Sequence, residues 1–394
     1  MATRDEIAAL GRSGAESVFG YVERTAEVVE DGIRWETLDY NNELNYNPSI
    51  FNGVAGICIF LADYFKLTGE ERARELALDG LRWCSRQELE RSYFALYFGW
   101  TSVLMGWLHL AKVTGDTGLL KNCQDDIETL LKWDIGPVTD VMGGASGNGF
   151  FLLRLWEATG DERYLEGAVR HAEWLREQAV RDEKGCYWPM KVGADEPAYY
   201  LGAAHGSCMI GYFLIALHEA TGEESWGELA REVLETLSKE AKADHGGLNW
   251  PPLLGMEEAG ACQWCHGAPG VGLVYTKAYE VWKETGYLET AEAAGEAVFA
   301  YGDVRENPSQ CHGLSGNAEL FIELYRITGK ELWLERAHAF AQLAFDYRET
   351  DVEGEMWSAD EKGLFSPDFM CGATGTGHFF LRLWKPQELR MPIS

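Results

Sequence analysis

The 394-residue sequence has few basic side chains: 34 Lys and Arg against 63 Asp and Glu, a formal net charge of −29. A surface of this sign repels phosphate backbones, which excludes a nucleic-acid-binding protein. Long hydrophobic runs are also missing. No stretch of about 18 apolar residues occurs, and the first residues, Met1 to Glu6, lack the apolar core of a secretory signal. These absences predict a cytoplasmic protein with no transmembrane segment.

Glycine-centred turns recur seven times, and each precedes an apolar stretch. The aligned glycines, which define turns one to seven, are Gly53, Gly99, Gly144, Gly206, Gly267, Gly313 and Gly372. The intervals after turns one, two and five are short and nearly equal, and the other three are longer. A Thr-Gly pair ends five of the stretches at one constant distance from the turn, at Gly69, Gly115, Gly160, Gly222 and Gly329, while Gly286 comes slightly later after its own turn. The constant distance corresponds to about four helical turns, and glycine commonly ends a helix.

Each repeat therefore predicts an apolar inner helix followed by an amphipathic outer helix. Periods of this size indicate stacked units that bury one another's faces, and seven of them without a polar capping unit predict a closed ring. We expect an all-α fold, a seven-fold α/α toroid with a double ring of inner and outer helices, in a single domain over residues 1–394. Residues from about Asp5 to Asp31 are expected to form an outer helix that helps to close the ring.

The three longer intervals hold inserts that combine Gly with Trp, which is typical of short hairpins or ordered loops. Their tryptophans are Trp188, Trp250 and Trp357. Two interpretations stay open from the sequence. The inserts either fill the rim of the fold or use these side chains to line a substrate cleft.

Two matching strings, Trp264-Cys265-His266-Gly267 and Gln310-Cys311-His312-Gly313, lie at the same phase of the repeat on successive turns. Thiolate and imidazole are the donors of tetrahedral zinc sites. Two Cys and one His leave a fourth position open, which is typical of a catalytic site. The spacing does not decide which histidine is the ligand, and two buried cysteines that share a phase by chance are the alternative.

Another histidine and an aspartate lie at neighbouring turns. His205 precedes the glycine of turn four and has no adjacent cysteine. It can therefore transfer protons, and its ordinary pKa near 6.5 suits that role; a hydrogen bond at the helix start is the alternative. Asp140, just ahead of turn three, either caps the third inner helix or orients His205.

The seven turns and both Cys-His-Gly motifs resemble the lanthionine synthetase C-like family, from about Phe51 to Leu383. The resemblance implies one zinc ion per chain, held by Cys265, Cys311 and His312, with His266 as a non-ligand. It also implies catalytic roles for His205 and Asp140.

The activity implied is that of a zinc-dependent lanthionine synthetase. Such an enzyme adds a cysteine thiol to dehydroalanine or dehydrobutyrine in a dehydrated precursor peptide, and His205 is expected to protonate the enolate that results. The chain contains no kinase-like or lyase-like segment, so we expect a separate dehydratase to prepare the peptide. The short intervals between turns one, two and three leave little room for an extra domain that would hold the leader of the peptide.

Three other functions are alternatives to a lanthionine synthetase. The chain could add glutathione or another small thiol to dehydroamino acids in proteins, although relatives of that type are expected to carry a lysine shortly before the second motif, and none occurs between Lys283 and Lys330. A carbohydrate-active α/α toroid would explain the Trp inserts but not Cys265 and Cys311. A non-catalytic scaffold with structural zinc is the third.

Several remaining cysteines and histidines are weaker candidates. The nine cysteines are odd in number and spread over a long chain, which argues against a disulfide framework. Cys208 is expected in the core. Cys262 forms Cys-x-x-Cys with Cys265 and is expected to be structural, with a second ligand or redox pair as the alternative. Cys371 lies one residue out of register and is expected to be a packed or lining thiol. His109 and His378 are expected to be satisfied core histidines.

Overall fold

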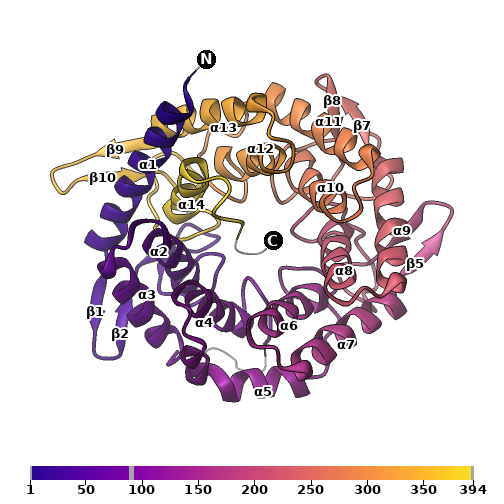
Figure 1. Cartoon of the computed structure of the whole chain (residues 1–394), viewed down its shortest axis with the longest axis horizontal. Coiled ribbons are helices and arrows are strands. Elements are labelled where there is room, and N and C mark those ends of the chain that lie inside the picture. Colours follow the sequence, from indigo (N-terminus) through magenta and orange to yellow (C-terminus); the bar gives the residue numbers. More distant parts are fainter. Residues whose placement is uncertain (1, 88–92, 392–394) are drawn as a thin grey trace. The chain divides into compact units, whose positions relative to one another are not determined.

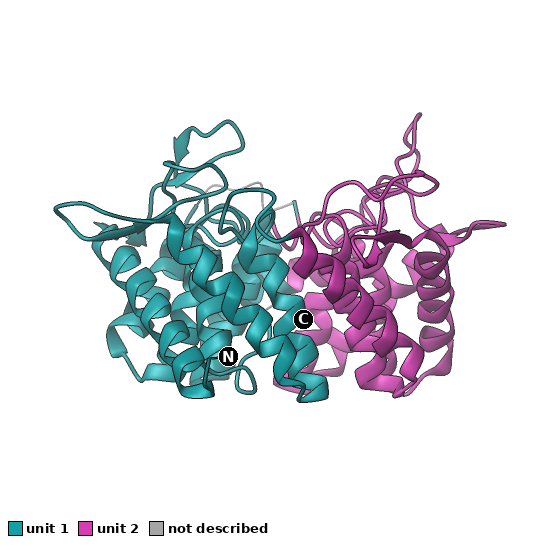
Figure 2. Cartoon of the chain, turned by 90° about the horizontal axis from the view of Figure 1, so that it is seen from above, with its two compact units in different colours: residues 1–93, 98–127, 302–394 teal, residues 94–97, 128–301 magenta. Residues whose placement is uncertain are grey.

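The computed structural model describes residues 2–87 and 93–391. It divides into two compact units, shown in Figure 2: unit 1 comprises residues 1–93, 98–127 and 302–394, and unit 2 comprises residues 94–97 and 128–301. Within the described ranges, no helix is both long and apolar enough to cross a lipid bilayer. The single-domain organisation over residues 1–394 stays a prediction.

Unit 1 contains seven α-helices, two 3-10 helices and three two-stranded antiparallel hairpins among its described residues. Its elements are α1 (Arg4–Arg24), β1 (Glu27–Val29), β2 (Gly32–Arg34), β3 (Thr37–Leu38), β4 (Leu44–Asn45), α2 (Val54–Thr68), α3 (Glu71–Cys84), α4 (Trp100–Thr114), η1 (Thr117–Cys123), α12 (Leu314–Thr328), α13 (Glu331–Ala344), η2 (Phe345–Tyr347), β9 (Arg348–Thr350), β10 (Glu355–Trp357) and α14 (Ala373–Trp384). The strands pair as β1 with β2, β3 with β4 and β9 with β10.

Unit 2 repeats the same helix pair, with hairpins after two of the pairs (Figure 1). Its elements are α6 (Ala145–Thr159), α7 (Glu162–Gln178), β5 (Val180–Asp182), β6 (Gly185–Tyr187), α8 (Ser207–Thr221), α9 (Glu224–Glu240), β7 (Lys242–Asp244), β8 (Gly247–Asn249), α10 (Ala268–Trp282) and α11 (Thr285–Tyr301). Helix α5 (Gln124–Lys132) begins in unit 1 and ends in unit 2. The hairpins pair β5 with β6 and β7 with β8.

The even-numbered helices α2 to α14 are the inner helices of the sequence pattern, and each begins directly after an aligned glycine. Glycine is required there because the backbone passes too closely for a side chain. A Cβ on Gly313 would lie 2.3 Å from the carbonyl oxygen of Asn307, and one on Gly144 would lie 2.4 Å from that of Val138. A tight backbone turn therefore precedes the inner helices, at the same place in each repeat.

The ends of the inner helices follow the predicted register. The five Thr-Gly glycines each adopt a left-handed conformation with φ between 67° and 73°, as a helix-ending glycine should. Helix α10 differs: Lys283, at φ 59°, takes the left-handed position at the same distance from its turn as those glycines. Gly286 is not a helix end but lies in the first turn of α11. Helix α10 therefore has 15 residues, as α8 and α12 do, although a lysine and not a glycine ends it.

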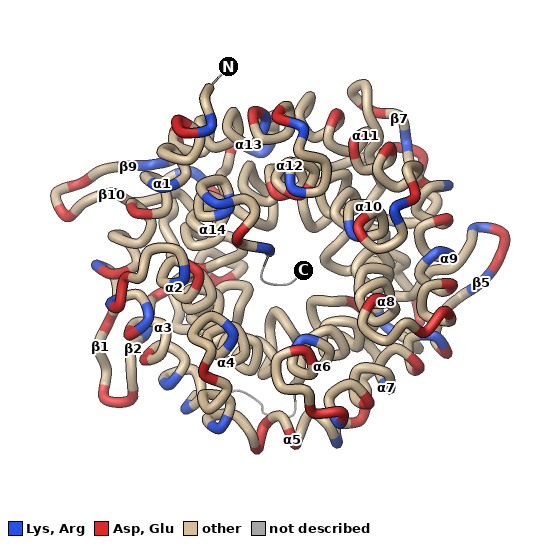
Figure 3. The backbone as a smooth tube through the Cα atoms, viewed as in Figure 1, with Lys and Arg blue, Asp and Glu red and all other residues tan. Residues whose placement is uncertain are grey.

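Outer helices such as α7 and α9 are amphipathic. The inner helices α2, α6, α8, α10 and α12 each pack against the outer helix that follows, whereas α4 packs against η1. Acidic and basic residues are interspersed along outer helices such as α7 and α9 (Figure 3). No helix follows α14 among the described residues, and α14 packs against α1 instead. The predicted N-terminal outer helix is therefore present, but it ends at Arg24, and residues 27–34 form a hairpin.

The hairpin tryptophans are core residues, so of the two interpretations the one in which they line a substrate cleft is wrong. Trp188, Trp250 and Trp357 are at most 1% exposed. The indole N–H of Trp188 donates to the carbonyl of Leu175 (2.6 Å), and that of Trp250 donates to the carbonyl of Leu237 (2.7 Å). These two bonds attach the hairpins to the outer helices before them, α7 and α9, whereas Trp357 donates to Oγ of Ser17 in α1 (3.0 Å). The rim-filling interpretation is therefore the one that agrees with the structure. The sequence analysis missed the hairpin of residues 27–34 because it precedes the first turn. Trp35, directly after this hairpin, donates its indole N–H to the carbonyl of Val22 in α1 (2.7 Å).

A buried polar network joins inner helices within unit 1. Asp63 of α2 lies 3.0 Å from Nε2 of His109 and 3.1 Å from Nε2 of His378. Burial alone would raise the pKa of Asp63, but the two histidines outweigh it and hold that pKa well below its ordinary value. His378 is buried and bonded to Asp63, as predicted for a satisfied core histidine, whereas His109 is half-buried and contacts Asp63 as an ion pair.

The same network contains a buried arginine. Arg382 of α14 is 0% exposed and pairs with Glu319 and Glu323 of α12. Two carboxylates buried without a cation would be strongly destabilising, because burial penalises each charge.

Replacing this arginine should destabilise unit 1. Arg382→Met should lower the free energy of unfolding by about 3–5 kcal/mol, since both partner glutamates stay buried. The control is Arg82→Met, which breaks an exposed pair with Asp79 and should cost less than about 1 kcal/mol. Urea unfolding followed by circular dichroism measures both; equal losses would contradict this account of the network.

Candidate functional site

Neighbouring turns in each unit are joined by backbone hydrogen bonds between their equivalent residues. In unit 1, Cys311 N donates to Met370 O (2.8 Å), and Met370 N donates to Phe51 O (2.9 Å). In unit 2, Ala204 N donates to Cys265 O (3.2 Å). Every residue named lies two positions before an aligned glycine. The backbone bonds thus place the side chains two positions before each glycine next to one another on adjacent turns.

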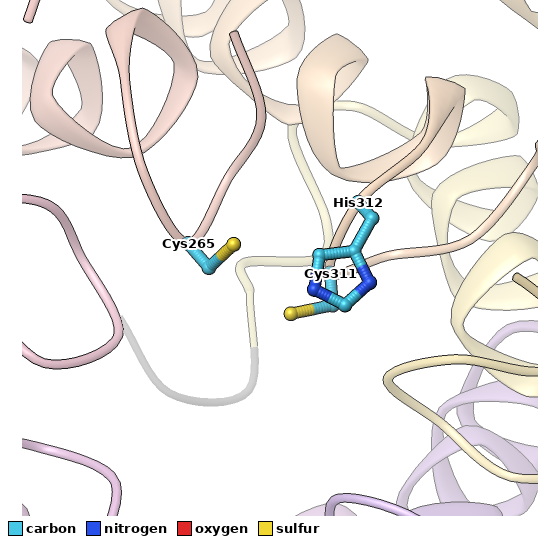
Figure 4. A group of neighbouring side chains, drawn as sticks. All are labelled: Cys265, Cys311 and His312. Carbon is cyan, nitrogen blue, oxygen red and sulfur yellow. The ribbon is translucent and has the colours of Figure 1, made fainter. Parts of the chain in front are cut away.

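The predicted metal ligands lie on these turns. Figure 4 shows Cys311 and His312 on the turn that leads into α12, and Cys265 on the turn that leads into α10. Cys311 and His312 belong to unit 1, and Cys265 belongs to unit 2. Each offers one ligand atom, and both cysteines are buried while His312 is half-buried.

In unit 1, His312 is held by its backbone and by its ring. Its N–H donates to Oγ of Ser309 (3.2 Å), and its ring Nδ1 lies 2.5 Å from Oδ2 of Asp360. Because Nδ1 is engaged by the carboxylate, Nε2 is the ring nitrogen that could hold a metal ion. Sequence reasoning missed Asp360, which lies in the segment after a hairpin and outside the repeated turn.

Within unit 1, three side chains of different types that can bind metal ions lie close together. The ligand atoms of His312, Asp360 and Cys371 all lie within 4.8 Å of one another, and they line a cavity of about 240 Å³ whose wall includes Tyr40 and Phe51. Sulfur, nitrogen and oxygen donors together form a possible metal site of mixed type. Cys371 lines this cavity, as expected for a lining thiol.

Another aspartate that the sequence analysis missed stabilises turn seven. Asp368 is fully buried, and its Oδ1 accepts a hydrogen bond from Cys371 N (2.9 Å). Burial raises its pKa to about 7. A sequence signal existed: Asp368 lies four residues before its aligned glycine, as Asp140 does before Gly144.

In unit 2 the structure brings Asp140 and His205 together. Oδ2 of Asp140 lies 2.7 Å from Nδ1 of His205, and Oδ1 accepts a hydrogen bond from Gly143 N (2.8 Å). Asp140 does not cap α6, whose N-cap is Gly144 without a side-chain bond. It therefore stabilises turn three and orients a histidine on turn four.

The electrostatics of this pair favour a protonated imidazole. Burial lowers the pKa of His205, but the hydrogen bond and negative charge of Asp140 outweigh burial, and the charge of Cys265 adds to them. The pKa of His205 therefore lies above its ordinary value near 6.5. The side chain is 34% exposed, so it can exchange protons with a bound molecule.

Turn five carries Cys265 beside this pair. Cys265 is 5% exposed, and Nε2 of Gln263 lies 3.2 Å from its sulfur. The ring of His266 packs near those of Tyr200 and His205, with centroids 5.5 and 6.3 Å away. A candidate proton donor and a candidate metal ligand thus occupy adjacent, hydrogen-bonded turns.

The remaining cysteines behave as structural residues. The nine cysteines all lie among the described residues, and none of them forms a disulfide bond there. Cys208 and Cys262 are at most 1% exposed, and burial raises the pKa of both thiols above the ordinary value. Neutral, buried thiols of this kind are inert, as expected for core residues.

Comparison with known proteins matches residues 45–393 to the family described as lanthionine synthetase C-like protein. Among solved structures, nisin cyclase is similar with a TM-score of 0.68 and 18% identity, covering 94% of this chain and 93% of that one. The predicted fold class, an all-α toroid of paired helices with short hairpins, is confirmed by this likeness.

Other similarities are more distant or partial. A GH76 α-mannanase of Bacteroides thetaiotaomicron has a TM-score of 0.53 at 12% identity, covering 95% of each chain, which is a likeness of fold alone. The glutathione S-transferase LANCL1 of Danio rerio is 31% identical over 103 residues. That match covers 26% of this chain and 25% of the relative.

Removing the charge of Asp140 should lower the pKa of His205. In Asp140→Asn the imidazole stays half-buried but loses its carboxylate, so we expect a fall of about one pKa unit or more. Titration of the His205 ring by NMR in the metal-free protein measures this change. Asp134→Asn removes the same charge from an exposed residue and should leave the pKa unaltered; a comparable fall in both variants would contradict the assignment.

Proposed function

Because the chain belongs to the lanthionine synthetase C-like family, we propose that it is a zinc-dependent lanthipeptide cyclase. It adds a cysteine thiol of a dehydrated precursor peptide to dehydroalanine or dehydrobutyrine, which forms a lanthionine or methyllanthionine ring. The proposal is carried by the hydrogen-bonded pair of Asp140 and His205 on the turns next to Cys265.

The proposed metal centre consists of Cys265, Cys311 and His312. Two thiolates and one imidazole fit zinc and leave one position for a substrate. The engaged Nδ1 of His312 fits as well, since ligating histidines ordinarily donate their second N–H to a neighbour. When bound, zinc supplies a deprotonated, positioned substrate thiol at neutral pH.

His205 is the proposed proton donor. The thiolate sulfur forms a bond to Cβ of the dehydro residue, and the electron pair of the double bond moves to an enolate. His205, whose pKa is raised by Asp140, gives its proton to Cα and then takes up the proton that the substrate thiol lost. The addition of the thiol across the double bond therefore needs no other reactant, because the thiol proton replaces the proton that His205 gives to Cα.

The peptide is the proposed partner, together with a separate dehydratase that prepares it. We place the reaction in the cytoplasm, where thiols such as the nine of this chain stay reduced. The likeness to nisin cyclase supports a peptide substrate rather than a sugar.

A second candidate is the addition of glutathione or another small thiol to dehydroamino acids in proteins. The partial likeness to the Danio rerio glutathione S-transferase favours it. The same metal centre and proton donor would serve both reactions. A carbohydrate-active role loses its support, because Trp188, Trp250 and Trp357 are buried and unable to stack on a sugar.

Zinc content and cyclisation should depend on Cys265 and not on its neighbour Cys262. The purified protein should contain about one zinc ion and convert a dehydrated peptide to a product with fewer alkylatable thiols, detected by mass spectrometry. Cys265→Ala should lose both properties, because a ligand is removed. Cys262→Ala, a buried thiol three residues away, should keep them.

Glutathione consumption in place of peptide cyclisation would favour the second candidate. Zinc-free wild-type protein with full activity would refute the proposed metal centre.

His205→Asn should keep zinc and lose rate. Without its proton donor the enolate step should slow by about 10²–10⁴-fold, measured as kcat with the same peptide. The wild-type rate should fall as pH rises through the raised pKa of His205, because only the protonated ring donates. His218→Asn, at the end of α8, is the matched control. A normal rate in His205→Asn would overturn the assignment.

A further inference from the structure

We propose that Asp360 is the positioning residue of the metal ligand His312. Its carboxylate holds the imidazole through Nδ1 and thereby presents Nε2 to the metal ion. The inference rests on the proposed zinc centre and concerns a residue that lies outside the repeated turns.

The contact is close and joins distant parts of unit 1. Oδ2 of Asp360 lies 2.5 Å from Nδ1 of His312, 48 residues earlier in the chain. Both side chains are largely buried, with exposed fractions of 27% and 29%. A carboxylate at this distance accepts a hydrogen bond from Nδ1–H. This bond selects one ring tautomer and makes the other ring nitrogen a better metal ligand.

The segment that carries Asp360 is held in place without its carboxylate. Trp357, at the end of β10, is 0% exposed. Ser358 and Phe365 form an isolated antiparallel bridge, and Ala359 N donates to Leu364 O (2.7 Å). The backbone bonds on both sides of Asp360 thus define its position, and the side chain is not needed to fold the segment.

Other loop aspartates of unit 1 behave differently. Asp39 accepts hydrogen bonds from the backbone N–H groups of Asn41 and Glu43. Asp351 accepts bonds from backbone N–H groups two and three residues further on. Asp360 makes no such backbone bond among the described residues, and its buried Oδ1 has no hydrogen-bond partner there. Its carboxylate is therefore directed to His312 rather than to its own loop.

Unit 2 contains the same arrangement for a different purpose. Asp140 contacts Nδ1 of His205 at 2.7 Å, and both His205 and His312 directly precede an aligned glycine. The two carboxylates come from different kinds of segment: Asp140 from a repeated turn, and Asp360 from the segment after a hairpin. A carboxylate orients the imidazole in each unit, once for proton transfer and once for metal binding.

Zinc affinity tests the role of Asp360. Zinc-free wild-type protein and its variants are titrated with Zn²⁺ in competition with a chromophoric chelator. Asp360→Ala should bind zinc about 10–100-fold more weakly, and Asp360→Asn, which still accepts a hydrogen bond, should be intermediate. Glu361→Gln removes a charge from the wall of the same cavity, where Glu361 pairs with Asn42, and should bind zinc as the wild type does.

The tautomer of His312 gives a readout that a merely structural residue would not change. Ring ¹⁵N spectra of the zinc-free protein should show the Nδ1–H form in the wild type and a mixture in Asp360→Ala. Circular dichroism should show equal folding of both.

The outcomes separate this inference from the proposed function. Wild-type protein that binds no zinc would overturn the metal centre and this inference with it. Wild-type binding with equal affinity in Asp360→Ala and an unaltered tautomer would overturn only the role of Asp360. Cobalt-substituted spectra that show a lost ligand in Asp360→Ala would make Asp360 a direct ligand and also overturn the positioning role.

Discussion

The close backbone packing of the glycine turns is the constraint on which the rest of the structure depends. At Gly144 and Gly313 a side chain would collide with a carbonyl oxygen six residues earlier. The turn closes tightly only because that space is empty, and it then bonds to the next turn through the residue two positions before the glycine. The side chains two positions before the glycines, among them Cys265 and Cys311, are consequently positioned by the backbone geometry of the turns.

Each unit uses this constraint to position an imidazole, and a carboxylate then determines what the imidazole can do. On turn four, the hydrogen bond and charge of Asp140 outweigh burial and raise the pKa of His205, the residue we propose as proton donor. On turn six, Asp360 contacts Nδ1 of His312, and in our proposal the other ring nitrogen binds the metal ion. In the proposed mechanism, the difference in function comes from the partners of the two rings and from the cysteine that precedes only His312.

Much of the fold could be predicted from the sequence because the repeat has local markers. Glycine at a crowded turn and glycine at a left-handed helix end are both consequences of short-range sterics, so Gly313 and Gly329 reveal themselves without tertiary information. The burial of Trp188 could not be predicted in this way, because a tryptophan beside glycine and proline suits a cleft as well as a core. Asp360 was missed for a related reason: its contact joins residues 48 positions apart, and no repeat marks it.

X-ray absorption spectroscopy at the zinc edge tests the central claim most directly. The account predicts one zinc ion with two sulfur neighbours at about 2.3 Å, one imidazole nitrogen at about 2.0–2.1 Å and one light atom. Adding a thiol-containing dehydrated peptide should replace the light atom by a third sulfur. A zinc ion with four protein ligands that ignores the peptide, or a protein without zinc, would contradict it.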